Sequence, residues 1–358
     1  MSNVVHLNVP SQNQRVAERQ TRLLCNFAQH RRVIDDVFWL KENAEILNIL
    51  ECTGARPAPE ALETHESFYG QVEKRMEFFP QYYRFLLSIC LDLEDLGMHG
   101  EKGEALVAWV ADQGLVEAEL SDLQRGEARR LLQRRGHELS QLDAGLDDRL
   151  RRFISRSATF AMPNKKAAYE LTHIIFYLSE YGRKDPFLDS EVRESLDFAG
   201  TLAFLDQNAD LLAEICIAMR YAGFSVPRNW VSWLERHSSN FAIESGAAAS
   251  IQDDYHEFFV CNWFLADTGQ EAFTRDFLSE RMTFHRPTIG IGPLREISEC
   301  MFRLKDRRSG NWGRMRPVLT ETLSEGAHEI LTQAEGASES FEAFFAGFAR
   351  VDLQGAML

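Results

Sequence analysis

This chain of 358 residues lacks the short motifs that identify several common classes of enzyme. It contains no P-loop, no G-x-S-x-G elbow, no H-E-x-x-H helix and no C-x-x-C-H haem site. Those motifs cradle phosphates, present a serine nucleophile, bind zinc or attach haem. Their absence leaves P-loop nucleotidases, hydrolases of these types and c-type haem proteins without support.

Cysteine is scarce and dispersed. No two of the six cysteines form a C-x-x-C pair, and most lie inside apolar segments such as S-I-C-L and E-I-C-I. In such surroundings cysteine behaves as a small apolar residue, not as a disulfide partner or a zinc ligand. We therefore expect free thiols, mostly buried, at Cys25, Cys52, Cys90, Cys216, Cys261 and Cys300.

Long apolar segments are also missing. No run approaches the roughly 20 apolar residues that a membrane span needs, and the N-terminus lacks the basic start and apolar core of a signal peptide. The formal net charge of −15 argues against general binding to nucleic acid or anionic membranes, because both interactions neutralise negative charge. We expect a cytoplasmic protein without a membrane partner.

One basic segment interrupts this acidic chain. Arg303–Pro317 reads R-L-K-D-R-R-S-G-N-W-G-R-M-R-P and contains Trp312. It could hold a phosphate, an acidic peptide or single-stranded nucleic acid, or it could be a solvated loop that offsets neighbouring acids. Nucleic acid is not expected to bind anywhere else on the chain.

The apolar residues recur at helical spacing, and no segment shows a convincing alternation with a period of two. The sequence therefore predicts an all-α chain without strands, in which 271–283 is one of the helices. Charged amphipathic helices over 116–160 are the best place for a subdomain boundary. The predicted parts are a disordered lead over 1–12, helical hairpins over 13–115, the charged pair over 116–160, and further hairpins over 161–358.

The ends of several apolar helices suggest a repeat. Each ends at a glycine, and the successive spacings are 48, 37, 41 and 46 residues for Gly97, Gly145, Gly182, Gly223 and Gly269. A period of about 40–45 residues fits one helical hairpin per repeat, as in an α/α solenoid or a closed α/α toroid. The alternative is that glycine ends many helices in any case.

The stretch Lys166–Gly182 combines apolar and ionisable residues on one helix. Spacings of three and four residues place Glu170, His173 and Tyr177 on one narrow facet, which is bordered by apolar residues on both sides. Ionisable groups in such surroundings are partly buried and need partners. We expect a buried polar centre at this facet.

Two further residues point to the same centre. Glu214 is the only charge between Asp210 and Arg220 in an apolar helix, and it stands nine residues before Gly223, as His173 stands nine before Gly182. His256 shares a helical face with Val260 and Trp263, so we expect it to point inward. If the inner helices ring a cavity, these groups could act as general acid and base or as ligands. Otherwise they are hydrogen-bonded residues of the core.

A metal site is one form of this hypothesis. Glu170-x-x-His173 places two metal-capable groups on one face, and paired Glu-x-x-His motifs build di-iron sites in helical bundles. A second copy occurs at Glu325-x-x-His328. Iron or zinc is the cofactor that these motifs could hold, with Glu170 and His173 as the candidate ligands.

The segments A-Y-E-L-T-H-I-I-F-Y-L-S-E-Y-G and D-D-V-F-W-L-K-E-N-A-E-I-L-N-I-L resemble those of an uncharacterised bacterial all-helical family. The resemblance implies no reaction and no cofactor. Two functions stay open. The chain is a repeat scaffold that binds a peptide or a protein on its helical surface, or it is an enzyme that acts on a small molecule or a peptide. The catalytic candidates are His173, Glu170, Glu214, His256 and Tyr177.

Overall fold

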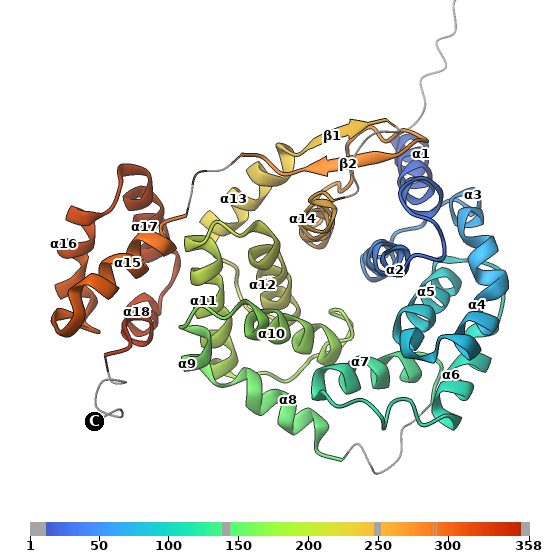
Figure 1. Ribbon diagram of the computed structural model, residues 1–358, viewed down its shortest axis with the longest axis horizontal. Coiled ribbons are helices and arrows are strands. Elements are labelled where there is room, and N and C mark those ends of the chain that lie inside the picture. Colours follow the sequence, from blue (N-terminus) through green and yellow to red (C-terminus); the bar gives the residue numbers. More distant parts are fainter. Residues whose placement is uncertain (1–11, 138–143, 247–251, 289, 291, 352–358) are drawn as a thin grey trace, which may run out of the picture.

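A computed structural model describes residues 12–137, 144–246, 252–288, 290 and 292–351. The prediction of an all-α chain is confirmed, and Figure 1 shows most of the helices arranged around a ring. The first half contains α1 Gln12–Cys25, α2 Val37–Cys52, α3 Pro59–Leu62, α4 Glu66–Phe78, α5 Tyr83–Leu96, α6 Lys102–Asp112, α7 Asp122–Gln133, α8 Leu146–Ile154, α9 Ser157–Phe160 and α10 Lys165–Leu178. The second half contains α11 Ser190–Leu205, α12 Ala209–Tyr221, α13 Arg228–Ser239, α14 Tyr255–Asp267, α15 Leu294–Leu304, α16 Trp312–Thr322, α17 Glu325–Ala337 and α18 Phe341–Ala349.

The ring has an inner and an outer layer of helices. The inner layer consists of α2, α5, α7, α10, α12 and α14, and each of these helices contacts the next. The last of them, α14, contacts α2 and so closes the ring. The outer helices α4, α6, α8, α11 and α13 pack against the outside of this layer (Figure 1). That a 40–45-residue unit repeats along the chain stays a prediction.

The inner helices all run in the same direction. Their C-terminal ends lie side by side, because Arg134 of the α7 end pairs with Asp95 of the α5 end, and Arg220 of α12 pairs with Asp267 of α14. Glycines with positive φ follow these helices, which is the usual left-handed helix stop: Gly54, Gly97, Gly136, Gly182, Gly223 and Gly269. The prediction that Gly145 belongs to this set was wrong, because Gly145 precedes α8 as its N-cap.

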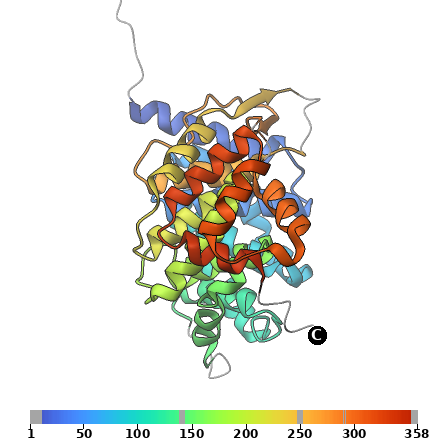
Figure 2. The ribbon, with the colours of Figure 1, turned by 90° about the vertical axis from the view of Figure 1, so that its left-hand side faces the viewer.

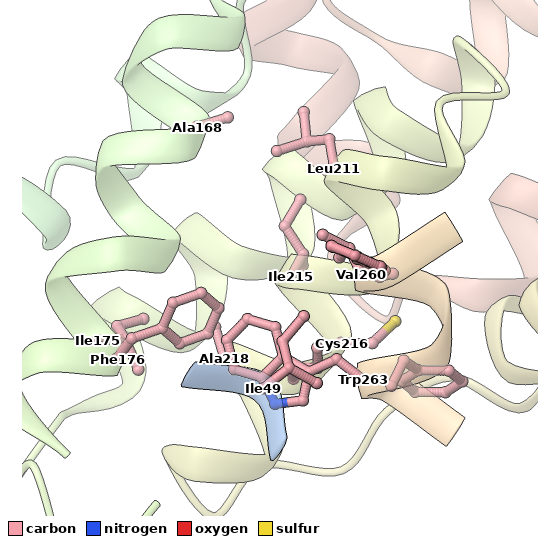
Figure 3. Close-up of a cluster of buried hydrophobic side chains, with 14 of the residues drawn as sticks. Ile49, Ala168, Ile175, Phe176, Leu211, Ile215, Cys216, Ala218, Val260 and Trp263 are labelled. Atoms are coloured by element: carbon pink, nitrogen blue, oxygen red, sulfur yellow. The ribbon is translucent and has the colours of Figure 1, made fainter. Parts of the chain in front are cut away.

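Apolar side chains fill the middle of the ring. Figure 3 shows them converging from four inner helices, with Ile49 of α2, Phe176 of α10, Ile215 of α12 and Trp263 of α14 among them. Each of these four side chains is at most 6 % exposed. An inner helix contacts neighbours on every side, which is why α12 reads as an almost continuous apolar run. All six cysteines are free, and four of them are buried.

Two short strands correct the expectation of a chain without β-structure. β1 Ala242–Ser245 and β2 Met282–His285 form an antiparallel pair with Ile243 opposite Phe284. The helix predicted over 271–283 was therefore wrong. Its apolar residues Phe273 and Phe277 are buried, but the chain there forms no helix, and the Phe273 N–H donates to the side chain of Asn262 instead of to a helical carbonyl.

A buried arginine ties the two ends of the ring together. Arg31 directly follows a π-helical turn at Asn26–His30. Its Nε donates to Glu42 at 3.0 Å, and its Nη1 donates to Asp253 at 2.8 Å. The side chains of Arg31, Glu42 and Asp253 are at most 1 % exposed. Asp253 also accepts a hydrogen bond from the Phe284 N–H. The start of α14 is thereby fixed against the N-terminal helices.

The last four helices, α15–α18, form a cluster beside the ring, and Figure 2 shows them in front of it. They attach through α17, which packs on α11 and α13, and through α18, which packs on α11. In this cluster Trp312 of the basic segment is buried against Phe341 and Phe345, with Nε1 donating to Glu335. Its ring is therefore not on the surface, where a nucleic-acid base could stack on it.

The segment 116–160, where a subdomain boundary was expected, supplies helices to the ring. Both α7 and α8 pack against α10. Among the described residues, no helix has both the length and the apolar character that a membrane crossing requires.

Candidate functional site

A cluster of ionisable side chains lies at the N-terminal ends of α12 and α14, in the inner layer. Asp210 and Glu214 stand one turn apart on α12, and His256 is the second residue of α14. The His256 Nε2 atom lies 3.3 Å from Asp210 Oδ1. One ligand-capable atom from each of Asp210, Glu214 and His256 lies within 4.8 Å of the other two.

A third inner helix, α2, contributes Glu45. Its Oε2 atom lies 3.2 Å from His256 Nδ1, so His256 stands between two carboxylates. The contact is close enough for an ion pair, but its atoms are not aligned as a hydrogen bond. Within the described residues, Glu45 Oε2, Asp210 Oδ1 and His256 Nδ1 are buried and make no hydrogen bond.

Helix α10 fixes the two carboxylates of α12 by hydrogen bonds. The Tyr169 hydroxyl donates to Asp210 Oδ2 at 2.6 Å, and the Thr172 hydroxyl donates to Glu214 Oε2 at 2.6 Å. These bonds hold the carboxylate planes in place and leave the other oxygen of Asp210 without a hydrogen-bond partner among the described residues. Tyr169 and Thr172 therefore position the carboxylates.

His173 lies beside this cluster on α10. Its Nδ1 atom is 2.8 Å from the Tyr169 carbonyl oxygen and 3.6 Å from Glu214 Oε2. A carbonyl oxygen only accepts, so in the neutral imidazole Nδ1 carries the proton and Nε2 presents its lone pair. The His173 side chain is 36 % exposed, so the ring is accessible to solvent.

The charges of the cluster shift one another's pKa values. Burial by itself lowers the pKa of His256, but the carboxylates of Glu45, Asp210 and Glu214 outweigh it and raise the pKa to about 10. Burial raises the pKa of the Glu214 carboxyl, although His173 opposes this shift. At neutral pH the centre therefore holds an imidazolium between carboxylates.

The donor set fits a divalent cation. Two ligand atoms that each lie about 2.1 Å from a tetrahedral metal are roughly 3.4 Å apart, close to the 3.3 Å between His256 Nε2 and Asp210 Oδ1. One imidazole with two or three carboxylates suits zinc, manganese or iron, because imidazole favours zinc and iron and carboxylate favours manganese. Asp210, Glu214 and His256 would hold the ion, with Glu45 as a further carboxylate.

The structure brings together three of the residues singled out in the sequence: His173, Glu214 and His256. It places Glu170 at the edge, where its carboxylate lies 3.8 Å from Lys166 Nζ. Tyr177 contacts the His173 ring with a centroid distance of 6.1 Å. The second Glu-x-x-His motif, at Glu325 and His328, lies on α17 in the C-terminal cluster, so the two copies do not meet.

Sequence reasoning missed Asp210 and Glu45. A signal for Asp210 existed, because it precedes Glu214 by four residues and so shares its helical face. An acid in the first turn of a helix is also favoured by the helix dipole, so this signal alone does not indicate a site. Glu45 had no local signal, because its position depends on the contact between α2 and α14.

A family model described as a domain of unknown function (DUF6902) matches residues 1–351, and the chain belongs to this family. The expectation of a family without an assigned activity is thereby confirmed. No curated protein and no solved structure matches the chain.

Proposed function

We propose that this protein is an enzyme that holds one divalent cation between α12 and α14 and uses it for acid/base chemistry on a small molecule. The observation that carries the proposal is the convergence of Asp210, Glu214 and His256 within 4.8 Å. Asp210 Oδ1, which lies 3.3 Å from His256 Nε2, makes no hydrogen bond among the described residues. Its one close partner in the described part of the chain is the His256 ring, so a cation that replaced the His256 proton would find this oxygen already turned toward it.

In this proposal the chain's residues have distinct roles. Asp210, Glu214 and His256 bind the cation, which would polarise a substrate oxygen or a water. Tyr169 and Thr172 donate to the carboxylates and fix their orientation. His173 Nε2 accepts a proton as general base, since Nδ1 is held by the Tyr169 carbonyl.

Cation binding is the step that can be measured without knowing the substrate. Isothermal titration calorimetry of the full chain with manganese and zinc salts, in two buffers of different ionisation enthalpy, gives the affinity and the number of protons released. We expect one cation per chain and release of about one proton at neutral pH, because His256 must lose its proton to become a ligand.

Two variants test which residues bind the cation. His256→Gln and Asp210→Asn each remove one ligand, and we expect a loss of at least about 100-fold in affinity, more than the loss of an outer partner causes. Asp267→Asn is the matched control, since it neutralises a carboxylate at the other end of α14 that pairs with Arg220. Undiminished binding by His256→Gln, or no binding by the unmodified chain, would refute the proposal.

A groove on the outside of the ring favours a second candidate function, the binding of a peptide. It has a volume of about 450 Å³ and lies where α11, the α12–α13 turn and the α17–α18 junction meet. Acidic side chains outnumber basic ones along it, as Glu191, Glu194, Asp197 and Glu339 face only Arg193. A scaffold would use this groove for a basic segment of a partner protein.

This second candidate predicts binding of a lysine-rich peptide, measured by fluorescence anisotropy. Glu191→Lys with Glu194→Lys should abolish binding, whereas His256→Gln should leave it unchanged. Equal binding by the Lys variant would exclude the groove.

A further inference from the structure

Phe302 is a large apolar side chain on the surface of the C-terminal cluster. It is 81 % exposed, and α15–α18 expose no other large apolar side chain among the described residues. Buried residues of α15 such as Ile297 and Met301 face the cluster, whereas Phe302 shares the outer face with Glu299, three residues before it. A single exposed apolar residue is common on protein surfaces, and it is the neighbours of Phe302 that distinguish it.

Basic side chains follow Phe302 directly in the chain. Residues 303–314 contain five cations and one acid, Asp306, and so carry a formal charge of +4 in a chain whose net charge is −15. The cations are Arg303, Lys305, Arg307, Arg308 and Arg314. Lys305, Arg307 and Arg314 are exposed, and their side chains make no hydrogen bond or ion pair to any described residue. Arg303 pairs with Glu299 at 3.2 Å, but both are exposed, so this pair contributes little.

The turn that carries these cations is anchored to the cluster. A 3-10 turn follows α15, and Arg308 closes it by donating from Nε to the Lys305 carbonyl at 3.1 Å. Arg308 Nη1 also donates to the Ala349 carbonyl at the end of α18. Asn311 Oδ1 accepts from the Arg314 N–H at 2.9 Å and so fixes the start of α16. A folded turn therefore presents the cations, and little backbone freedom is lost when a partner binds there.

An exposed ring beside unpaired cations matches the chemistry of single-stranded nucleic acid. Cations neutralise its phosphates, and an unpaired base stacks on an aromatic ring whatever the base sequence. A membrane surface fits less well, because insertion needs an apolar face of several side chains and the described part of this surface offers Phe302 alone. An acidic peptide would use the cations but not the ring. A duplex keeps its bases stacked on one another and presents none to Phe302.

We propose that Phe302, Lys305, Arg307 and Arg314 form a docking surface for a short segment of single-stranded nucleic acid. One base would stack on the Phe302 ring, while the three cations would each contact a backbone phosphate. The net negative charge of the rest of the chain repels phosphates, so the segment bound is short. The proposal is independent of the cation centre at His256.

Fluorescence anisotropy of a labelled oligothymidylate measures this binding on the full chain. A length of about ten nucleotides lies in the usual range of site sizes for single-strand binders. Titrations between about 50 and 200 mM salt give the number of phosphates contacted. Three contacts predict a slope of about −2 for the logarithm of the binding constant against that of the salt concentration, which is a loss of roughly 20-fold over this range.

Two variants separate stacking from charge. Phe302→Ala should weaken binding by at least about fivefold and leave the salt slope unchanged, because only the contact with the base is lost. Arg307→Gln with Arg314→Gln should make the slope shallower by about 1.4, since each phosphate contact on a single strand accounts for about 0.7.

Matched controls lie in the first half of the chain. Phe78→Ala removes a ring that is 77 % exposed on α4, and Arg56→Gln with Lys74→Gln removes two exposed cations. These variants change the apolar surface or the total charge as the test variants do, so their affinity and salt slope should stay close to those of the unmodified chain. Thermal unfolding of every variant checks that the fold is kept.

Three results would overturn the proposal. One is the absence of any anisotropy change when the unmodified chain is added at low salt. Another is unchanged affinity in Phe302→Ala, which would leave a surface that attracts anions in general. The third is a preference for another anion, shown by a polyglutamate peptide that binds as tightly as the oligonucleotide, or by phosphatidylserine vesicles that bind when the oligonucleotide does not. Cation binding at His256 is measured separately, so none of these results bears on that centre.

Discussion

Replacement of Arg31 by alanine removes the buried cation that joins the start of the ring to its last inner helix. Asp253, with a fully buried side chain, loses two charge-assisted bonds, of 2.8 and 2.9 Å, and among the described residues keeps only the Phe284 N–H. Glu42 keeps Arg32, whose Nε lies 2.6 Å away. One carboxylate is thus left uncompensated.

Breaking a buried pair from one side costs about 3–5 kcal/mol. Because Asp253 keeps one donor, we expect Arg31→Ala to lower the free energy of unfolding by about 3 kcal/mol, the lower end of that range. Urea denaturation followed by circular dichroism measures the change. Arg295→Ala is the control, since its partner Glu299 is exposed and such pairs contribute about 0–1 kcal/mol.

A double variant tests the cause of the loss. Arg31→Met with Asp253→Asn removes the stranded charge and keeps an acceptor for the Phe284 N–H, so most of the stability should return. A cost of less than about 1 kcal/mol for Arg31→Ala would refute the reasoning, because a buried pair would then be no stronger than an exposed one. Weaker cation binding is also expected, since Asp253 stands three residues before His256.

Three further outcomes are expected. NMR titration should give His256 a pKa of about 10, lowered in Asp210→Asn. This pKa is above the unfolded value of about 6.5, so the stabilisation is complete below pH 6.5 and is lost as the pH rises through 10. The side chain is 37 % exposed, so screening limits the effect to about 1 kcal/mol, measurable by urea denaturation at several pH values. Phe187→Gly should raise the unfolding free energy by about 1 kcal/mol in the same assay, because Phe187 is exposed and has a φ of 52°. Thr172→Val removes the donor to Glu214 and should weaken cation binding by about 10–100-fold in calorimetry, as the loss of an outer partner usually does.

The sequence predicts those helices that are recognisable from their own residues and end signals. Apolar runs that end in glycine identified inner helices such as α10 and α12. The end of α7 was misplaced because Gly136 follows the polar sequence L-Q-R-R, which lacks the apolar character of the other inner helices. The irregular chain near Phe273 resembled a helix because its buried phenylalanines, Phe273 and Phe277, are spaced by four residues, as on a helix face.

The candidate site was predictable only in part. Glu214 and His256 could be recognised, because an isolated ionisable group on an apolar face needs a partner. Their neighbours were not, because the contact between Glu45 and His256 depends on how far the ring of inner helices turns before it closes. The same holds for Asp253, whose ion pair with Arg31 joins residues 222 positions apart in the chain.

Crystals soaked in a zinc salt would test the His256 centre most directly, through anomalous scattering at the zinc absorption edge. The account predicts one strong peak about 2.0–2.2 Å from Asp210, Glu214 and His256 Nε2, and no peak there in His256→Gln. A structure that holds zinc at other positions, with His256 still paired to Asp210 and Glu45, would contradict it.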